Sequence, residues 1–228
     1  MIYPSVTVAM LIYRSPAWLS FSLEGLSWAR NRTPYRTMVV GNDAEPQVMD
    51  TGRVDVDHRN DDPGEYYLNR VYKAWNRAVE SAETDWVALI SSDMYVSDYW
   101  LDSLVQRKIA DQRTLPNPLF VESGRIPSAM PEYVRDFGTT VDGFNRDDWQ
   151  RHAQFLRLRN EGKCEPGRLF SPLVDRREFA DIGGYPPGNV NGVSGDRILF
   201  DKYAAAGYKW VTCLDSVVYH TQEGEMRG

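Results

Sequence analysis

Short apolar runs alternate with stretches of helical periodicity along the first half of this chain. Leu19, Leu23 and Leu26, for example, recur at helical spacing after Ser15-Pro16, a pair typical of a helix start. Such alternation buries both faces of a parallel sheet, so we predict the α/β class, with a Rossmann-like, mostly parallel central sheet and helices on both faces. We expect strands at 5–13, 36–43, 53–58 and 86–90, and helices from Ser15, over 65–82 and after Asp98 as an N-cap.

The second half of the chain is less regular. We expect a helix near 147–160 and another that Ser194 caps and that runs to about Ala205. Two separate short strands, YKWVTC and SVVYH, are predicted to close the chain. No linker or repeat divides the sequence, and 42% of its residues are hydrophobic, so residues 1–228 are predicted to form a single domain. Further strands are expected at 118–123 and 169–174.

Composition excludes several classes of protein. The formal net charge is -6 and no extended basic run is present, so we do not expect nucleic-acid binding. No apolar stretch approaches the roughly 20 residues that span a bilayer. The first strand-like run follows neither a basic stretch nor a long apolar core, so we expect no signal peptide. Cys164 and Cys213 show neither zinc spacing nor a disulfide framework, which is compatible with a reducing compartment. We therefore expect a soluble, cytoplasmic protein.

The stretch WVALISSD (86–93) is an apolar run that stops abruptly at two hydroxyls and a carboxylate. Ser and Asp are good turn formers, so an ordinary turn explains it. Open α/β sheets also bind their ligands just beyond the carboxyl ends of their strands, so a ligand site at Asp93 explains it as well. The neighbouring sequence favours the ligand site.

Together with its flanks, this stretch resembles the GT-A fold of the family-two glycosyltransferases, which move a sugar from a nucleotide-sugar donor. VTVAMLIYR resembles the first strand of that family, ending near Tyr13. VVGND resembles the second strand, with Asn42 in place of the usual Asp. LNRVYKAWNRAVESAETDWVALISSD resembles the helix and strand that lead to the D-x-D signature, and places Arg70, Asn76 and Asp93 on its positions.

The end of the chain extends the resemblance. DIGGYPPGNVNGVSGDRILFDKYAAAGYKWVTCLDSVVYH is similar to the C-terminal pattern of the family, with Asp196 on its acidic position and His220 on its terminal histidine. The resemblance thus covers nearly the whole chain and implies one GT-A domain. By the same resemblance, about 1–112 would bind the nucleotide sugar and about 113–228 would bind the acceptor.

The resemblance also implies a set of donor-binding residues. Asp93 and His220 would hold Mn²⁺ or Mg²⁺, because a divalent cation neutralises the charge of a diphosphate. The chain departs from the family at Ser91 and Ser92, where a further carboxylate is common and where hydroxyls are poor metal ligands. The implied nucleotide contacts, with a UDP-sugar as donor, are Tyr13, Asn42, Arg70, Ser92 and Asp93.

Asp196 is the implied general base, which removes a proton from a hydroxyl of a glycan or other acceptor and leads to inversion at the anomeric carbon. Its place in the first turn of a helix favours the ionised carboxylate. The same place also suits an Asp that serves only the helix dipole. His220 is equally explained as a buried, hydrogen-bonded histidine, and Asn76 is more simply a structural residue.

Two other functions remain open from the sequence. A nucleotide- or glycan-binding protein of the same fold without turnover is favoured by the missing second carboxylate. An NAD-dependent dehydrogenase is disfavoured, because no G-x-G-x-x-G follows the first strand.

Overall fold

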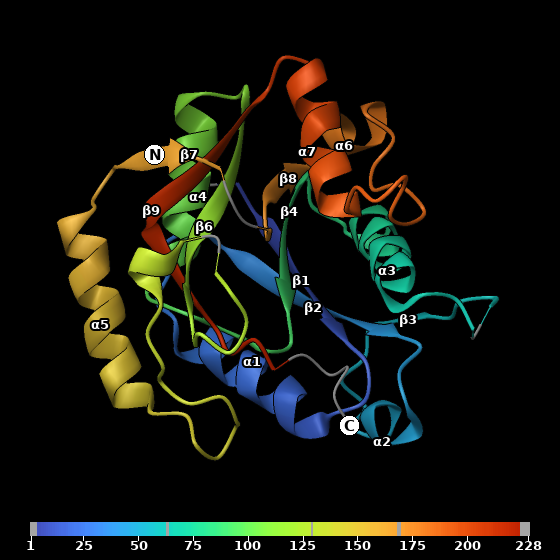
Figure 1. The fold of residues 1–228 in the computed structure, drawn as a ribbon, viewed down its shortest axis with the longest axis horizontal. Helices are drawn as coiled ribbons and strands as arrows, with labels where there is room; N and C mark the ends of the chain where they lie inside the picture. Colours follow the sequence, from blue (N-terminus) through green and yellow to red (C-terminus); the bar gives the residue numbers. More distant parts are fainter. Residues whose placement is uncertain (1–3, 63, 129, 168–169, 224–228) are drawn as a thin grey trace.

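The central sheet has the strand order β3-β2-β1-β4-β8 in the computed structural model, which describes residues 4–62, 64–128, 130–167 and 170–223 (Figure 1). Neighbouring strands are parallel except for β8, which runs antiparallel to β4. The predicted mostly parallel sheet is therefore confirmed. Its strands are β1 (Val6–Ile12), β2 (Tyr35–Asn42), β3 (Val56–His58), β4 (Trp86–Ser91) and β8 (Leu173–Asp175).

Strand β1 is buried on both faces, and this shows how the helices cover the sheet. Its even-numbered residues, such as Val8 and Met10, share a core with the helices α1 (Pro16–Trp28) and α4 (Trp100–Ala110). Its residues Ala9 and Leu11 share a second core with α3 (Tyr67–Ser81) and α7 (Gly195–Ala205). Because successive side chains of a strand point to opposite faces, the two cores lie on opposite sides of the sheet. Helices on both faces are therefore confirmed, and Figure 1 shows α3 and α7 across the sheet from α1.

A second, mixed sheet that the sequence did not predict lies beside the first. Strand β9 (Lys209–His220) is central in it, parallel to β6 (Thr114–Glu122) and antiparallel to β5 (Met94–Val96) and β7 (Cys164–Pro166). The prediction of two separate closing strands is wrong: the β6–β9 register shifts between Pro118 and Leu119, but β9 continues through the irregularity. Helix α5 (Arg146–Arg159) packs on β9.

Three short helices complete the described elements: α2 (Pro46–Met49), the 3₁₀ turn η1 (Pro131–Tyr133) and α6 (Arg176–Asp181). The predicted N-caps Ser15 and Ser194 are confirmed, since each side chain accepts a backbone N–H. The predicted cap at Asp98 is wrong, because its carboxylate instead accepts hydrogen bonds from Arg30, and Tyr99 is the N-cap residue of α4. None of the helices within the described ranges is long and apolar enough to cross a membrane.

A buried lysine on α4 forms an ion pair with a glutamate on α6. The side chain of Lys108 on α4 is only 2% exposed, and its Nζ lies 2.6 Å from Oε2 of Glu178 on α6. The same ammonium donates to the carbonyl oxygens of Gln112 and Thr114, at 2.7 and 3.0 Å. A buried charge is tolerated only when it is paired and hydrogen-bonded, and Lys108 satisfies both conditions.

Replacing Lys108 by Met tests this connection. We expect the free energy of unfolding to fall by about 3 kcal/mol, because Glu178 and two carbonyl groups lose their donor. Lys209→Met is the matched control: its exposed ammonium lies 3.6 Å from Asp111, and its loss should cost less than about 1 kcal/mol. Urea unfolding of both variants measures the difference, and equal effects would contradict a structural role for Lys108.

Candidate functional site

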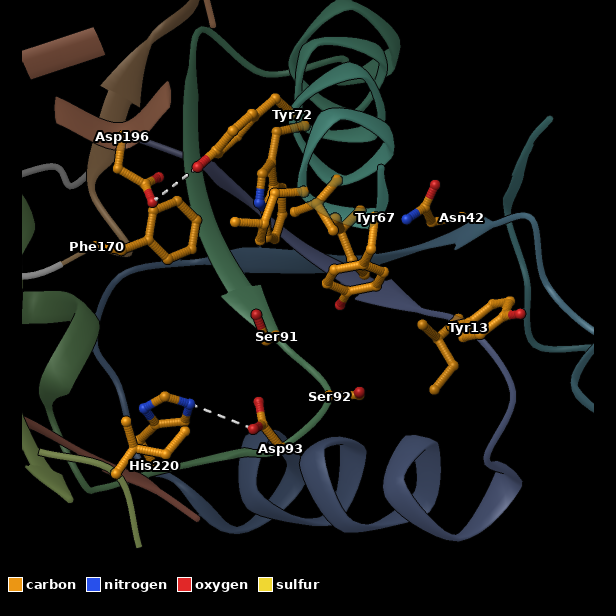
Figure 2. Close-up of a pocket in the computed structure, with 16 residues that line it drawn as sticks. Tyr13, Asn42, Tyr67, Tyr72, Ser91, Ser92, Asp93, Phe170, Asp196 and His220 are labelled. Atoms are coloured by element: carbon orange, nitrogen blue, oxygen red, sulfur yellow. Dashed lines mark hydrogen bonds and ion pairs between the residues drawn. The ribbon is translucent and has the colours of Figure 1, made fainter. Parts of the chain in front are cut away.

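A cavity of about 350 Å³ opens at the carboxyl ends of β1, β2 and β4 (Figure 2). Its wall combines aromatic and apolar side chains with a few polar ones, as is typical of a small-molecule site. Six of the seven residues predicted from the sequence line it: Tyr13, Asn42, Ser92, Asp93, Asp196 and His220. The other lining residues are Leu11, Ile12, Tyr67, Leu68, Val71, Tyr72, Trp75, Ser91, Ile126 and Phe170.

Strand register brings the polar residues of the first half together. Ile12 at the end of β1 lies opposite Gly41 of β2, so Tyr13 and Asn42 leave the sheet side by side. On the other side of β1, Leu11 lies opposite Ser91 of β4. Parallel strands with this register end at one edge of the sheet, and that edge carries the cavity.

Asp93 lies in the tight turn between β4 and β5, and it also lines the cavity. The two interpretations of this stretch are thus compatible. Strand β5 pairs with β9 so that Met94 lies opposite His220, and the backbone oxygen of Asp93 accepts from Thr221 N at 3.1 Å. As a result, Oδ2 of Asp93 lies 3.2 Å from Nε2 of His220 (Figure 2).

Glu122 is a site residue that the sequence analysis missed. It ends β6 directly opposite His220 of β9, and its Oε1 lies 3.3 Å from His220 Nδ1. The ring of His220 therefore lies between two carboxylates, as a hydrogen-bonded histidine. Burial opposes the charged ring, but Asp93 and Glu122 outweigh it and raise the pKa of His220 to about 10. The signal for Glu122 was the same as for Asp93, a carboxylate at the end of an apolar run.

An ion pair lies next to the cavity residues Tyr13 and Asn42, near the end of β2. Arg70 does not line the cavity wall among the described residues, but its NH1 lies 3.2 Å from Asp43 Oδ2, and its guanidinium lies 6.0 Å from the ring centre of Tyr13. Asn60 donates to Asp43 and also to Oδ1 of Asn42, at 3.2 Å. Burial opposes the ionised form of Asp43, but the hydrogen bonds from Asn60 and Arg70 hold its pKa below the usual value. The acidic side chain at this strand end is thus Asp43, one residue after the predicted Asn42.

Asp196 lies in the first turn of α7, on the side of the cavity away from Asp93 and His220 (Figure 2). Tyr72 Oη lies 3.5 Å from Asp196 Oδ2. Burial raises the pKa of Asp196 to about 6, although the hydroxyls of Tyr185 and Tyr72 favour ionisation. The helix N-terminus favours the ionised carboxylate, but the loss of water contact has the larger effect on this pKa.

A clamp formed by Asn76 and Gly184 positions the tyrosines beside Asp196. Asn76 pairs with both backbone groups of Tyr185, accepting from its N at 2.8 Å and donating to its O at 3.0 Å. The ring of Tyr185 then stacks on Tyr72, with 5.3 Å between ring centres. Asn76 thus has a structural role, in agreement with the simpler interpretation. Gly184 adopts φ 54°, and a Cβ there would lie 2.6 Å from Asn76 Oδ1.

Asp93 fits a divalent cation of the Mn²⁺ type, which accepts carboxylate oxygen, and His220 fits it once Nε2 has lost the proton that its pKa of about 10 retains at neutral pH. Across the described ranges of the chain, we find no group of three or more His, Cys, Asp or Glu side chains arranged to hold a metal. A cation here would therefore take further ligands from water or from the oxygen atoms of its substrate.

The architecture is a GT-A-like, Rossmann-type α/β fold. It matches the crystal structure of GalNAc-T7 with UDP, GalNAc and Mn²⁺, with a TM-score of 0.64 and 15% sequence identity. The match covers 99% of this chain and 45% of the GalNAc-T7 chain, so this chain spans less than half of that protein. Such a low identity establishes the fold alone, and membership of family two stays a prediction. Neither the family models nor the curated proteins that we compared match the sequence.

The clamp predicts a specific difference between two glycines with positive φ. Ala at Gly184 would contact Asn76 and the Phe179 ring, whereas nothing lies within 4 Å of a Cβ at Gly192. We expect Gly192→Ala to cost about 1 kcal/mol through the left-handed backbone alone. Gly184→Ala should cost about 1–3 kcal/mol more through overpacking. Thermal and urea unfolding measure both, and equal losses would show that the clamp is not tightly packed.

Proposed function

We propose that this protein is a glycosyltransferase that moves a sugar from a nucleoside diphosphate donor, UDP-linked, to a hydroxyl acceptor. One observation carries the proposal: polar residues from distant parts of the sequence line one cavity at the carboxyl ends of three strands, on a GT-A-like fold. The likeness to GalNAc-T7, a structure with UDP and Mn²⁺, supports the class of donor. The division of the chain into a donor half, about 1–112, and an acceptor half, about 113–228, belongs to this proposal.

In this proposal the nucleobase lies near Tyr13 and Asn42. Oδ1 of Asn42 already accepts a hydrogen bond from Asn60, so its NH₂ group is the better placed to donate to a uracil carbonyl. Arg70 contributes through its ion pair with Asp43 beside the Tyr13 ring. Uracil is favoured because its ring offers two carbonyl acceptors to such donors.

The diphosphate would lie at the turn of Ser92 and Asp93. Asp93 and His220 would hold Mn²⁺ or Mg²⁺, and the cation supplies charge neutralisation of the departing diphosphate. Glu122 accepts from His220 Nδ1 and so fixes the ring with Nε2 toward Asp93. Because the pKa of His220 is about 10, the cation would have to displace the Nε2 proton before that nitrogen could serve as a ligand.

Asp196 is the proposed base. It lines the same cavity but lies away from Asp93, so an acceptor hydroxyl beside it would face the sugar from the side opposite the diphosphate (Figure 2). The carboxylate would take the hydroxyl proton as the acceptor oxygen bonds to the anomeric carbon and the bond to the diphosphate breaks, with inversion. Its raised pKa, about 6, makes it a stronger base than an exposed Asp while leaving it ionised at neutral pH.

A binding protein without turnover is the second candidate. It is favoured by Ser91, which lines the cavity where a second carboxylate would strengthen a metal site. Incubation with a panel of UDP-sugars and Mn²⁺ separates the two functions. A transferase slowly hydrolyses its donor by transferring the sugar to water, which releases UDP, whereas a binding protein releases no UDP.

The donor site is tested by calorimetry of UDP binding with and without Mn²⁺. We expect UDP to bind more tightly than GDP, and Mn²⁺ to increase the affinity for UDP. In Asp93→Asn, the factor by which Mn²⁺ increases the affinity for UDP should fall at least about tenfold, since the substitution removes a charged ligand. Asp201→Asn, an exposed Asp paired with Arg197, is the control and should bind as the wild type does. Tighter binding of GDP, or Mn²⁺ dependence unchanged in Asp93→Asn, would refute this donor site.

The base is tested by Asp196→Asn, which keeps the shape of the side chain. We expect the rate of UDP release to fall by about 10²–10⁴-fold with UDP affinity unchanged. In the wild type the rate should rise with pH through about 6, as the carboxylate ionises.

Stability provides a second measurement on the same variant. With the folded pKa near 6 and an unfolded value near 3.9, the native state holds a proton that the unfolded state has lost, so Asp196 makes stability decrease as pH rises from about 4 to 6. Asp196→Asn should lessen that decrease. Full activity of Asp196→Asn would show that Asp196 is not the base and serves only the N-terminus of the helix.

A further inference from the structure

The two cysteines of the chain face each other across a pair of antiparallel strands. Cys164 begins β7 and lies directly opposite Cys213 of β9. Their sulfur atoms are 3.8 Å apart, and both are free thiols. The sequence predicted no disulfide framework, because 48 intervening residues give no sign that these strands pair.

The backbone hydrogen bonds define the type of this pair. Leu214 N donates to Lys163 O at 2.9 Å, and Gly167 N donates to Trp210 O at 3.0 Å. Hydrogen-bonded pairs alternate along an antiparallel ladder, so Cys164 and Cys213 occupy a non-hydrogen-bonded position between two such pairs. Cα atoms at these positions are about 4.5 Å apart, within the range of about 4.4–6.8 Å that a disulfide bridges. Rotation of the side chains is therefore sufficient to join the sulfurs.

The two thiols differ in reactivity. Cys213 is 1% exposed in the core, whereas Cys164 is partly exposed and can meet a small molecule from solvent. Contact with the Cys213 thiol and the positive charge of Arg107 lower the pKa of Cys164 to about 7, although burial and Asp215 act in the opposite direction. The pKa of Cys213 is raised. A thiolate is the nucleophile in thiol oxidation, so Cys164 is the thiol that reacts first.

We propose that Cys164 and Cys213 form a redox modification site, in which a peroxide converts the two thiols into an intramolecular disulfide. The Cys164 thiolate attacks one peroxide oxygen, the O–O bond breaks, and hydroxide leaves with a proton as water. Cys213 then attacks the Cys164 sulfenic acid, the S–S bond forms, and a second water leaves. In total, two thiols and one hydrogen peroxide give one disulfide and two waters, and an external dithiol reverses the reaction.

The bond would fasten β7 to the central strand of the second sheet. β7 has only three residues and pairs with β9 alone among the described strands, so few backbone hydrogen bonds hold it. A disulfide would close a loop of roughly 50 residues that includes α6 and α7, and such closure stabilises mainly by restricting the unfolded chain. Oxidation should therefore raise the thermal midpoint of the protein.

Intact-mass analysis of the purified protein tests the proposal without any substrate. After dilute hydrogen peroxide, quenching and unfolding without reductant, we expect a loss of about 2 Da, a fall from two titratable thiols to none, and full reversal by dithiothreitol. The thermal midpoint should rise by several degrees on oxidation and return on reduction. Peptide mapping should join the two segments that contain Cys164 and Cys213.

Two variants provide the controls. Cys164→Ser replaces the more exposed cysteine by a side chain of similar size. This variant should show neither the mass loss nor the shift of the thermal midpoint. Cys213→Ala avoids a polar atom in the core and should instead stop at an oxidised Cys164 or a mixed disulfide with added glutathione. Two free thiols after peroxide treatment, disulfide-linked dimers at low protein concentration, or further oxidation of Cys164 in the wild type would each overturn the proposal. Because none of these measurements uses a sugar donor, the result is independent of the proposed transferase function.

Discussion

The burial of β1, β2 and β4 on both faces is the constraint on which the candidate site depends. These strands run parallel with matched ends, and their interior residues contact helices on either side. Unpaired polar side chains are costly in such a position, so they collect where the strands leave the sheet. Tyr13, Asn42 and Ser92 follow from this rule, since each stands at or just beyond the last residue of its strand. The polar lining of the cavity is thus a consequence of the burial of these strands on both faces.

The second sheet completes the site from the other half of the chain. His220 ends β9 between β5 and β6, so one neighbouring strand brings Asp93 and the other brings Glu122. A one-residue slip in either pairing would turn these side chains to the other face, because side chains alternate along a strand. The long, buried β9 therefore sets the position of the histidine more firmly than a loop could. Its pairing with β5 also ties the turn of Asp93 to the C-terminal part of the described chain.

Local pattern was sufficient for the main elements and for the strand-end residues, but it could not supply contacts between distant segments. The prediction for Asp196 placed it correctly on a capped helix, but the local pattern gave no sign of the burial that raises its pKa or of the hydroxyls of Tyr72 and Tyr185, far away in sequence, that lower it. The cap at Asp98 failed for the same reason, since Arg30 binds that carboxylate. Glu122 and Asp43 were missed because their partners, His220 and Arg70, lie far away in sequence and are brought to them by strand register and by the fold.

The surroundings of Asp196 combine two opposing physical effects in one position. The helix N-terminus and the tyrosine hydroxyls stabilise the carboxylate, while burial destabilises it, and the balance leaves a pKa near 6. A more exposed Asp would be ionised but weakly basic, and a fully enclosed one would stay protonated at neutral pH. The balance depends on where the tyrosine rings lie, and Gly195 allows Tyr72 to approach α7 so closely that a Cβ there would lie 2.4 Å from the ring. Asn76 and Gly184 fix the second ring in turn. The positions of both rings beside Asp196 therefore depend on Gly195, its neighbour in the chain, and on Asn76 and Gly184.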